Sequence, residues 1–155
     1  MKLPDGSDKK KILADLYYID AETAFFKKNY AFALSKCLEA DKLKKGLDDE
    51  TREIRYYAQI GKIKLMQHDI DSAMTDFSKG LEVAKRLKRI DEVTKNTYGY
   101  AICLLIKGQR HEAESMVRNI EKKFGAVPLF ITDEILRTEY KKKVLKHSSM
   151  IGDVN

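Results

Sequence analysis

Residues 69–80 of the chain read DIDSAMTDFSKG, and two other stretches align with them without gaps. These are NYAFALSKCLEA at residues 29–40 and QRHEAESMVRNI at residues 109–120. One alanine recurs in each stretch at an interval of 40 residues, as Ala33, Ala73 and Ala113. A fixed interval of this length indicates a repeat architecture, in which each unit stacks on its neighbours.

Each unit contains two helical patterns separated by a short interruption. In the second unit, apolar residues recur at helical spacing over residues 51–67, and Asp69 is the expected N-cap of a helix over residues 70–88. The third unit predicts helices over residues 91–107 and 110–124. The first unit predicts helices over residues 8–28 and 30–45, with Asn29 as the cap between them. Glycines are expected to end the second helices of the outer units, at Gly46 and Gly125.

A small residue also recurs in the first helix of each unit, as Ala21, Gly61 and Ala101. Small side chains on both helices of a pair allow the two axes to cross closely. An alanine-rich helical bundle without repeats is the alternative, but a bundle has no reason to keep a fixed interval.

These positions resemble those of the tetratricopeptide repeat (TPR) family. The second unit matches best, and the matching residues are Tyr57, Ile60, Gly61, Ala73, Phe77 and Gly80. The first unit departs from the pattern at Asp20 and Cys37, and Val117 is a weak match in the third. The resemblance implies an all-α fold, an α-α superhelix of three helix pairs. A C-terminal capping helix is expected over residues 132–147.

The TPR interval is about 34 residues, so the units of this chain are longer. The extension resembles that of the Rap and PlcR type of bacterial peptide-pheromone receptors and, less closely, that of the kinesin light chains. We expect one domain over residues 1–155, with repeats at about 9–46, 48–88 and 90–125.

Composition excludes several classes of protein. Charged residues make up 35% of the chain and apolar ones 43%, which is typical of a soluble globular protein. The longest apolar stretch, residues 98–106, is too short to span a membrane, and the first residues lack a signal-peptide core. Two cysteines, Cys37 and Cys103, fit a reducing compartment, so a cytoplasmic location is expected.

The sequence offers little catalytic chemistry. The three histidines lie far apart, both cysteines fall on expected packing positions, and no glycine-rich phosphate loop follows a strand. Acidic pairs such as Asp48-Asp49 are typical of helix N-termini. We therefore expect a protein that is not an enzyme and that holds no cofactor and no metal.

Positive charge makes nucleic acid the obvious alternative partner. The formal net charge is +6, and four basic runs occur, at residues 9–11, 42–45, 85–89 and 141–143. Three of them lie at helix ends or unit junctions, and acidic residues follow closely. A solvated face explains these runs better than a nucleic-acid site, because no nucleic-acid-binding motif accompanies them.

The TPR resemblance implies that the first helices line a concave groove. Matching positions place nine partner-binding candidates there, together with Ile106: Tyr18, Glu22, Phe25, Arg55, Lys62, Met66, Lys95, Tyr98 and Ile102. The alternative is that some of these residues pack beneath the C-terminal helix. Arg55, Lys62 and Lys95 should share one face, and they would repel one another unless acids such as Glu22 or a ligand neutralise them.

The resulting interpretation is a non-catalytic TPR module that binds a protein or an acidic peptide in this groove. It could serve as the sensor or adaptor part of a larger regulator. The alternatives are a nucleic-acid-associated adaptor that uses the basic runs and a self-associating scaffold, and the sequence leaves the oligomeric state open.

Overall fold

A computed structural model describes residues 6–43, 50–124 and 134–152. Within these residues the chain is all-α, as expected, and forms no strand. The helices are α1 (Gly6–Phe26), α2 (Tyr30–Leu43), α3 (Glu50–Met66), α4 (Ile70–Arg86), α5 (Ile90–Ile106), α6 (Arg110–Phe124) and α7 (Glu134–Gly152).

The turn inside each helix pair repeats at the interval seen in the sequence. Lys28, His68 and Gly108 all adopt positive φ, at 61°, 63° and 82°. The following residue then donates its N–H to a carbonyl five residues back, as Asn29 does to Ala24 at 2.9 Å. This is the left-handed C-terminal turn of a Schellman motif. The turn recurs 40 residues apart inside the three helix pairs. A fourth copy joins α4 to α5, where Lys88 has a φ of 56° and the Arg89 N–H donates to the Ala84 carbonyl at 3.0 Å, so the same turn also ends a helix between units.

The two expected N-caps behave differently. The Phe32 N–H donates to Asn29 Oδ1 at 3.4 Å, so Asn29 caps α2 with its side chain. Asp69 occupies the N-cap position of α4, but its side chain makes no capping hydrogen bond. The expected helix ends at Gly46 and Gly125, and the expected start at Thr132 and Asp133, lie outside the described residues.

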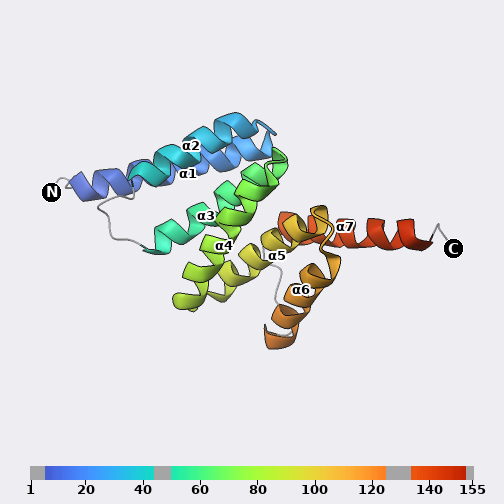
Figure 1. Ribbon diagram of the computed structural model, residues 1–155. Coiled ribbons are helices and arrows are strands. Elements are labelled where there is room, and N and C mark those ends of the chain that lie inside the picture. The colour runs from blue at the N-terminus through green and yellow to red at the C-terminus, as the bar shows by residue number, and fades with distance from the viewer. Residues whose placement is uncertain (1–5, 44–49, 125–133, 153–155) are drawn as a thin grey trace.

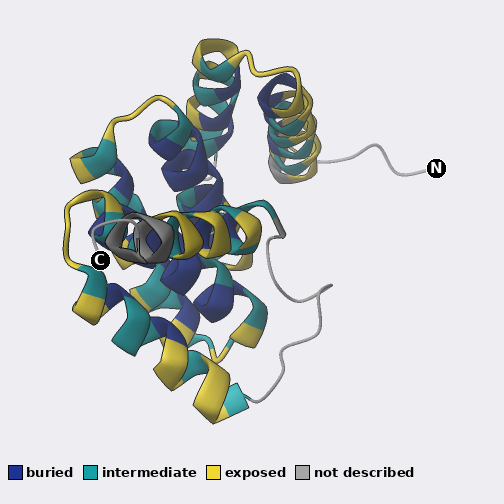
Figure 2. Ribbon diagram, turned by 90° about the vertical axis from the view of Figure 1, so that its right-hand side faces the viewer, coloured by how far each residue is buried: buried dark blue, intermediate teal, exposed yellow. Residues whose placement is uncertain are grey.

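Helices pack mainly on their neighbours in the chain. Contacts run from α1 to α2 and onward in order to α6, while α3 and α5 also touch directly. The pair α1–α2 lies at one end, and α3–α4 and α5–α6 follow along the molecule (Figure 1). The buried residues line the sides on which the helices face one another (Figure 2). This order places successive first helices near each other, as a stack of pairs requires.

The recurring small residues form the tightest contacts of the core. Ala21, Ala101 and the three second-helix alanines, Ala33, Ala73 and Ala113, have no exposed surface. Gly61 is also buried, and a methyl group there would lie 2.9 Å from Phe77 Cε1. A methyl group at Gly99 would overlap the same ring. The Phe77 ring of α4 is therefore held between a glycine of α3 and a glycine of α5.

The C-terminal helix differs from the expectation in extent and in place. It was expected over residues 132–147, but α7 continues to Gly152. It packs against α5, and the first turns of α7 overlap the C-terminal end of α5 in Figure 1. Leu136 and Tyr140 join the core cluster that contains Ile102 and Phe77. The helix therefore covers part of the α5 surface as well as closing the end of the stack.

Replacing Gly99 by Ala should lower the free energy of unfolding by about 1–3 kcal/mol, because the new methyl group would overlap the Phe77 ring. Chemical denaturation followed by circular dichroism measures this difference. Combining Gly99→Ala with Phe77→Leu, which shortens the opposing side chain, should cost about 1 kcal/mol less than the sum of the two single changes.

The control is Gly6→Ala at the start of α1, where a methyl group meets no atom within 4 Å. That change should be neutral or slightly stabilising, since alanine favours a helix over glycine by about 1 kcal/mol. Equal effects at positions 6 and 99 would show that Phe77 does not lie against Gly99.

Candidate functional site

Three first helices supply one charged and aromatic surface, called here the first-helix face. Its residues are Tyr18 and Glu22 of α1, Arg55 and Lys62 of α3, and Glu92 and Lys95 of α5. The 40-residue interval relates Arg55 to Lys95 and Glu22 to Lys62. Equivalent positions on stacked helices therefore form this face.

Tyr18 lies at the centre of the first-helix face. The guanidinium carbon of Arg55 is 5.6 Å from the centre of the Tyr18 ring, and the ring of Tyr56 is 6.0 Å away. Burial raises the pKa of the Tyr18 hydroxyl, the charges of Glu22 and Glu92 raise it further, and Arg55 lowers it. Side chains from α1, α3 and α5 thus act on one phenol.

The cations of this face already have neighbours. Lys62 Nζ lies 4.9 Å from the centre of the Phe25 ring, within the range of a cation–π contact. Lys95 Nζ lies 3.4 Å from Glu92 Oε1. The sequence interpretation named Glu22 as the acid that would intervene between the cations, whereas Lys95 is paired with Glu92. Arg55 is exposed and stacks on Tyr18.

Four predicted groove residues are buried: Phe25, Lys62, Tyr98 and Ile102. Their burial contradicts the prediction that the groove presents these four side chains to a partner. The α7 helix covers the two on α5, because the rings of Tyr98 and Tyr140 are 5.5 Å apart and Ile102 packs in the same cluster. Tyr98 also donates its hydroxyl to Glu121 at 3.2 Å.

The remaining predicted residues stay accessible. Arg55 is exposed, and Tyr18, Glu22, Met66 and Lys95 are half-buried. Ile106, at the end of α5, is also exposed. The open part of the predicted groove is therefore smaller than expected and more polar.

Glu92 is a member of this face that the sequence interpretation missed. Its side chain is 2% exposed, and Oε2 has no hydrogen-bond partner among the described residues. Burial raises the pKa of this carboxyl, and the neighbouring Lys95 lowers it by less. In the sequence, Glu92 looks like one more acidic residue in the first turn of a helix. Only the packing of α5 against α3 and α4 distinguishes it.

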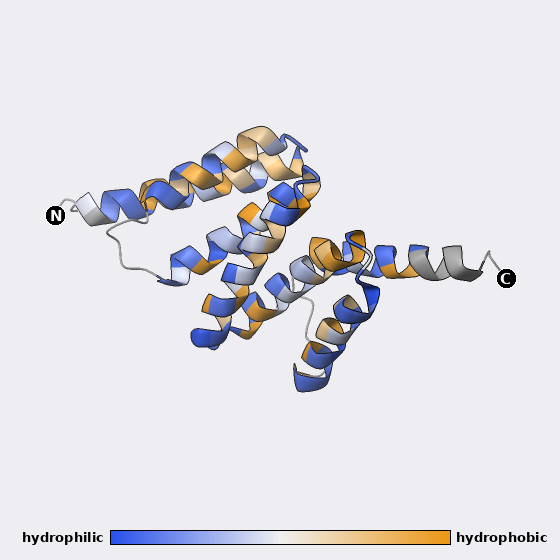
Figure 3. Ribbon diagram, viewed as in Figure 1, coloured by the Kyte–Doolittle hydropathy of each residue, from blue (hydrophilic) through white to orange (hydrophobic). Residues whose placement is uncertain are grey.

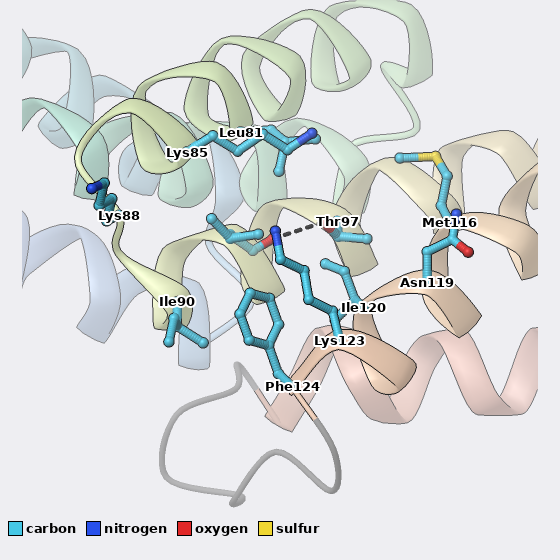
Figure 4. Close-up of a pocket in the computed structure, with 11 residues that line it drawn as sticks. Leu81, Lys85, Lys88, Ile90, Thr97, Met116, Asn119, Ile120, Lys123 and Phe124 are labelled. Carbon is cyan, nitrogen blue, oxygen red and sulfur yellow. Dashed lines mark hydrogen bonds between the residues drawn. The ribbon is translucent and has the colours of Figure 1, made fainter.

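A second concave site lies between α4, α5 and α6, and is called here the α4–α6 trough. Its volume is about 710 Å³, and Figure 4 shows the side chains that line it. The lining is Leu81, Lys85, Lys88, Ile90, Val93, Thr97, Met116, Asn119, Ile120, Lys123 and Phe124. It contains three lysines, and none of the lining residues just named carries a carboxylate.

The basic run at residues 85–89 is the sequence feature that could have indicated the trough. Its arginines pair with acids: Arg86 with Glu50 at 2.6 Å, and Arg89 with Asp91 at 3.2 Å. The lysines of the same run, Lys85 and Lys88, instead line the trough. The arginines of the run therefore form ion pairs at helix ends, while its lysines form a positively charged side of the trough.

Cys37 and Cys103 are buried and free, and burial raises the pKa of each thiol to about 12. No group of three or more metal-ligating side chains occurs in residues 6–43, 50–124 and 134–152. In the same ranges, no helix combines the length and the apolar character needed to cross a membrane.

Comparison with protein-family models, with curated proteins and with solved structures gives no match to this chain.

Replacing Glu92 by Gln should raise the free energy of unfolding at pH 7.5 by about 1 kcal/mol, because it removes a buried charge with an unpartnered oxygen. The folded pKa of Glu92 lies above its ordinary value of 4.5, so the native protein loses stability as the pH rises from 4.5 through the folded pKa. The increase in the free energy of unfolding that Glu92→Gln produces should therefore become smaller as the pH falls toward 4.5. Urea unfolding at a series of pH values measures it.

Glu82→Gln is the matched control, since Glu82 is an exposed carboxylate of α4. It should change stability little at any pH. A gain from Glu92→Gln that does not depend on pH would contradict the assignment of a buried, ionised carboxylate.

Proposed function

We propose that the chain is a non-catalytic TPR module that binds a peptide or protein segment on the concave side of a short superhelix. The proposal draws support from the left-handed turn that recurs 40 residues apart inside the three helix pairs and from the buried alanines at the same interval. The contact of α3 with α5 fits the neighbouring first helices of such a superhelix.

One observation carries the binding proposal. Tyr18 of α1 lies within electrostatic reach of Arg55 of α3 and of Glu92 of α5, and the Arg55 guanidinium lies over its ring. Tyrosine and arginine are the residues most enriched among the energetic centres of protein interfaces. A segment that lies across these helices would contact both.

The charges specify the ligand further. Arg55 is the exposed cation of this face, while Lys95 is held by Glu92. A carboxylate of the ligand would therefore pair first with Arg55, and its backbone would lie over the Tyr18 ring. We propose an acidic peptide and expect Arg55 to contribute more than Lys95. A sensor or adaptor role in the cytoplasm, as part of a larger regulator, is consistent with such a module.

A nucleic-acid adaptor is the weaker alternative. Of the run at residues 85–89, Arg86 and Arg89 pair with Glu50 and Asp91. Paired arginines offer less to phosphates, because each would first have to leave its carboxylate.

Self-association is a second candidate, and the outer face of α1 favours it. Ile12, Leu16 and Ile19 are 53–55% exposed and lie on one side of the helix. The residues 40 positions after Leu16 and Ile19 are Tyr56 and Gln59, and each of these is buried, with only 3% of its surface exposed. Hydrophobic residues are visible along α1 in Figure 3. The side of the helix that is buried on α3 is thus exposed at the equivalent positions of α1. A second copy of the chain could cover this exposed side.

Replacing Arg55 and Lys95 by Ala should weaken peptide binding by more than tenfold, about 1.4 kcal/mol. Peptides selected from a displayed random library against the native protein serve as probes, and fluorescence anisotropy measures their affinities. The single change Arg55→Ala should account for most of the loss, because Arg55 is the exposed cation.

The control for this pair removes two exposed lysines elsewhere, with Lys79→Ala and Lys122→Ala. That variant carries the same net charge and should bind the probes within about twofold of the native protein. Selected peptides whose affinity is unchanged by the loss of Arg55 and Lys95 would refute the concave site.

Replacing Ile12 and Ile19 by Glu should abolish self-association if α1 forms the contact between copies, because it places charges on an apolar interface. Sedimentation velocity at several concentrations measures the assembly. Leu145→Glu, at an exposed leucine of α7, is the control and should leave assembly unchanged. A native protein that stays monomeric up to its solubility limit would eliminate this candidate.

A further inference from the structure

We infer that the α4–α6 trough is a second binding site, which takes an acidic amphipathic helix of a partner protein. The trough is built by α4, the first half of α5 and the second half of α6, whereas the first-helix face is built by α1, α3 and α5. The inference therefore does not depend on peptide binding at the first-helix face.

The floor of the trough is apolar. Leu81 of α4, Val93 of α5 and Ile120 of α6 belong to one hydrophobic cluster, in which Val93 is buried and the other two are partly exposed. Ile90, at the start of α5, is 45% exposed and also lines the trough. Covering such side chains releases about 25 cal/mol for each Å² of apolar surface removed from water. An apolar ligand face therefore gains by lying on this floor.

The walls of the trough are cationic on both sides. Lys85 comes from the last turn of α4, Lys88 from the turn between α4 and α5, and Lys123 from α6 (Figure 4). Lys123 Nζ lies 5.4 Å from the centre of the Phe124 ring. Among the residues that the structure describes, no carboxylate forms a salt bridge with any of these three lysines. Their charge is thus left for a ligand to neutralise.

This arrangement selects one class of ligand. A fatty acid has a single carboxylate and could engage only one wall, and a nucleic acid has no apolar face for Leu81, Val93 and Ile120. An amphipathic helix presents an apolar stripe at i, i+3, i+4 and i+7, and it can carry glutamates along both edges of that stripe. The apolar stripe would lie on the floor while the glutamates meet Lys85 and Lys88 on one side and Lys123 on the other.

The test uses a fluorescein-labelled peptide of about 18 residues, roughly five helical turns, with leucines on one stripe and glutamates on both edges. Fluorescence anisotropy at about 0.15 M salt measures its affinity for the full chain. Lys85→Glu with Lys123→Glu should weaken binding at least tenfold. Lys79→Glu with Lys122→Glu makes the same change in net charge outside the trough, and it should weaken binding less than twofold.

Three further binding measurements test the inference. Circular dichroism verifies that each variant is folded. Ile90→Ser, at an exposed position, should also weaken binding. A peptide with the same composition but no apolar stripe should bind at least tenfold more weakly. Arg55→Ala should leave the affinity of the acidic helix unchanged, so that failure here is distinct from failure at the first-helix face.

Several results would overturn the inference. One is an equal loss of affinity in the two lysine pairs, which would mean that net charge alone attracts the probe. A second is a loss of probe affinity in Arg55→Ala, which would place the helix on the first-helix face. A third is full displacement of the probe by laurate or by a short DNA duplex at equal concentration, which would mean that the trough takes that class of ligand instead. Failure of the probe to bind the native protein would also refute it.

Discussion

The stack depends on the position of one aromatic ring. Phe77 of α4 has no exposed surface and lies between Gly61 of α3 and Gly99 of α5. A methyl group at either glycine would displace the ring, so the two first helices can approach α4 only where they carry no side chain. Gly80 plays a similar part toward Asn96, whose amide fills the space beside it. These contacts fix how far apart α3, α4 and α5 lie and how they are rotated.

That rotation has consequences on both sides of the molecule. Because the side of α5 that carries Gly99 is turned toward Phe77, Glu92, two helical turns earlier on the same side, comes within electrostatic reach of Tyr18 on the first-helix face. On α4, residues on the side away from α3 meet α5 and α6 across the α4–α6 trough. The same packing therefore supports two different surfaces, one of mixed charge and one with an apolar floor between lysines.

The sequence predicted the helices and their turns because these follow from local patterns. The interval of 40 residues located the turns at His68 and Gly108, and both adopt the left-handed conformation. Accessibility at the candidate site was harder to predict, because it depends on α7. That helix buries Tyr98 and Ile102 through Tyr140, and no repeat position indicates where a helix outside the repeat will lie. The burial of Glu92 and the α4–α6 trough likewise depend on how neighbouring helices pack.

The most direct test of this account is a nuclear Overhauser experiment on the isotopically labelled chain. It should show cross-peaks from the Phe77 ring protons to the α-protons of both Gly61 and Gly99, because the ring lies against the backbone of α3 and of α5. Cross-peaks to only one of the two glycines, or to neither, would contradict the packing on which both surfaces depend.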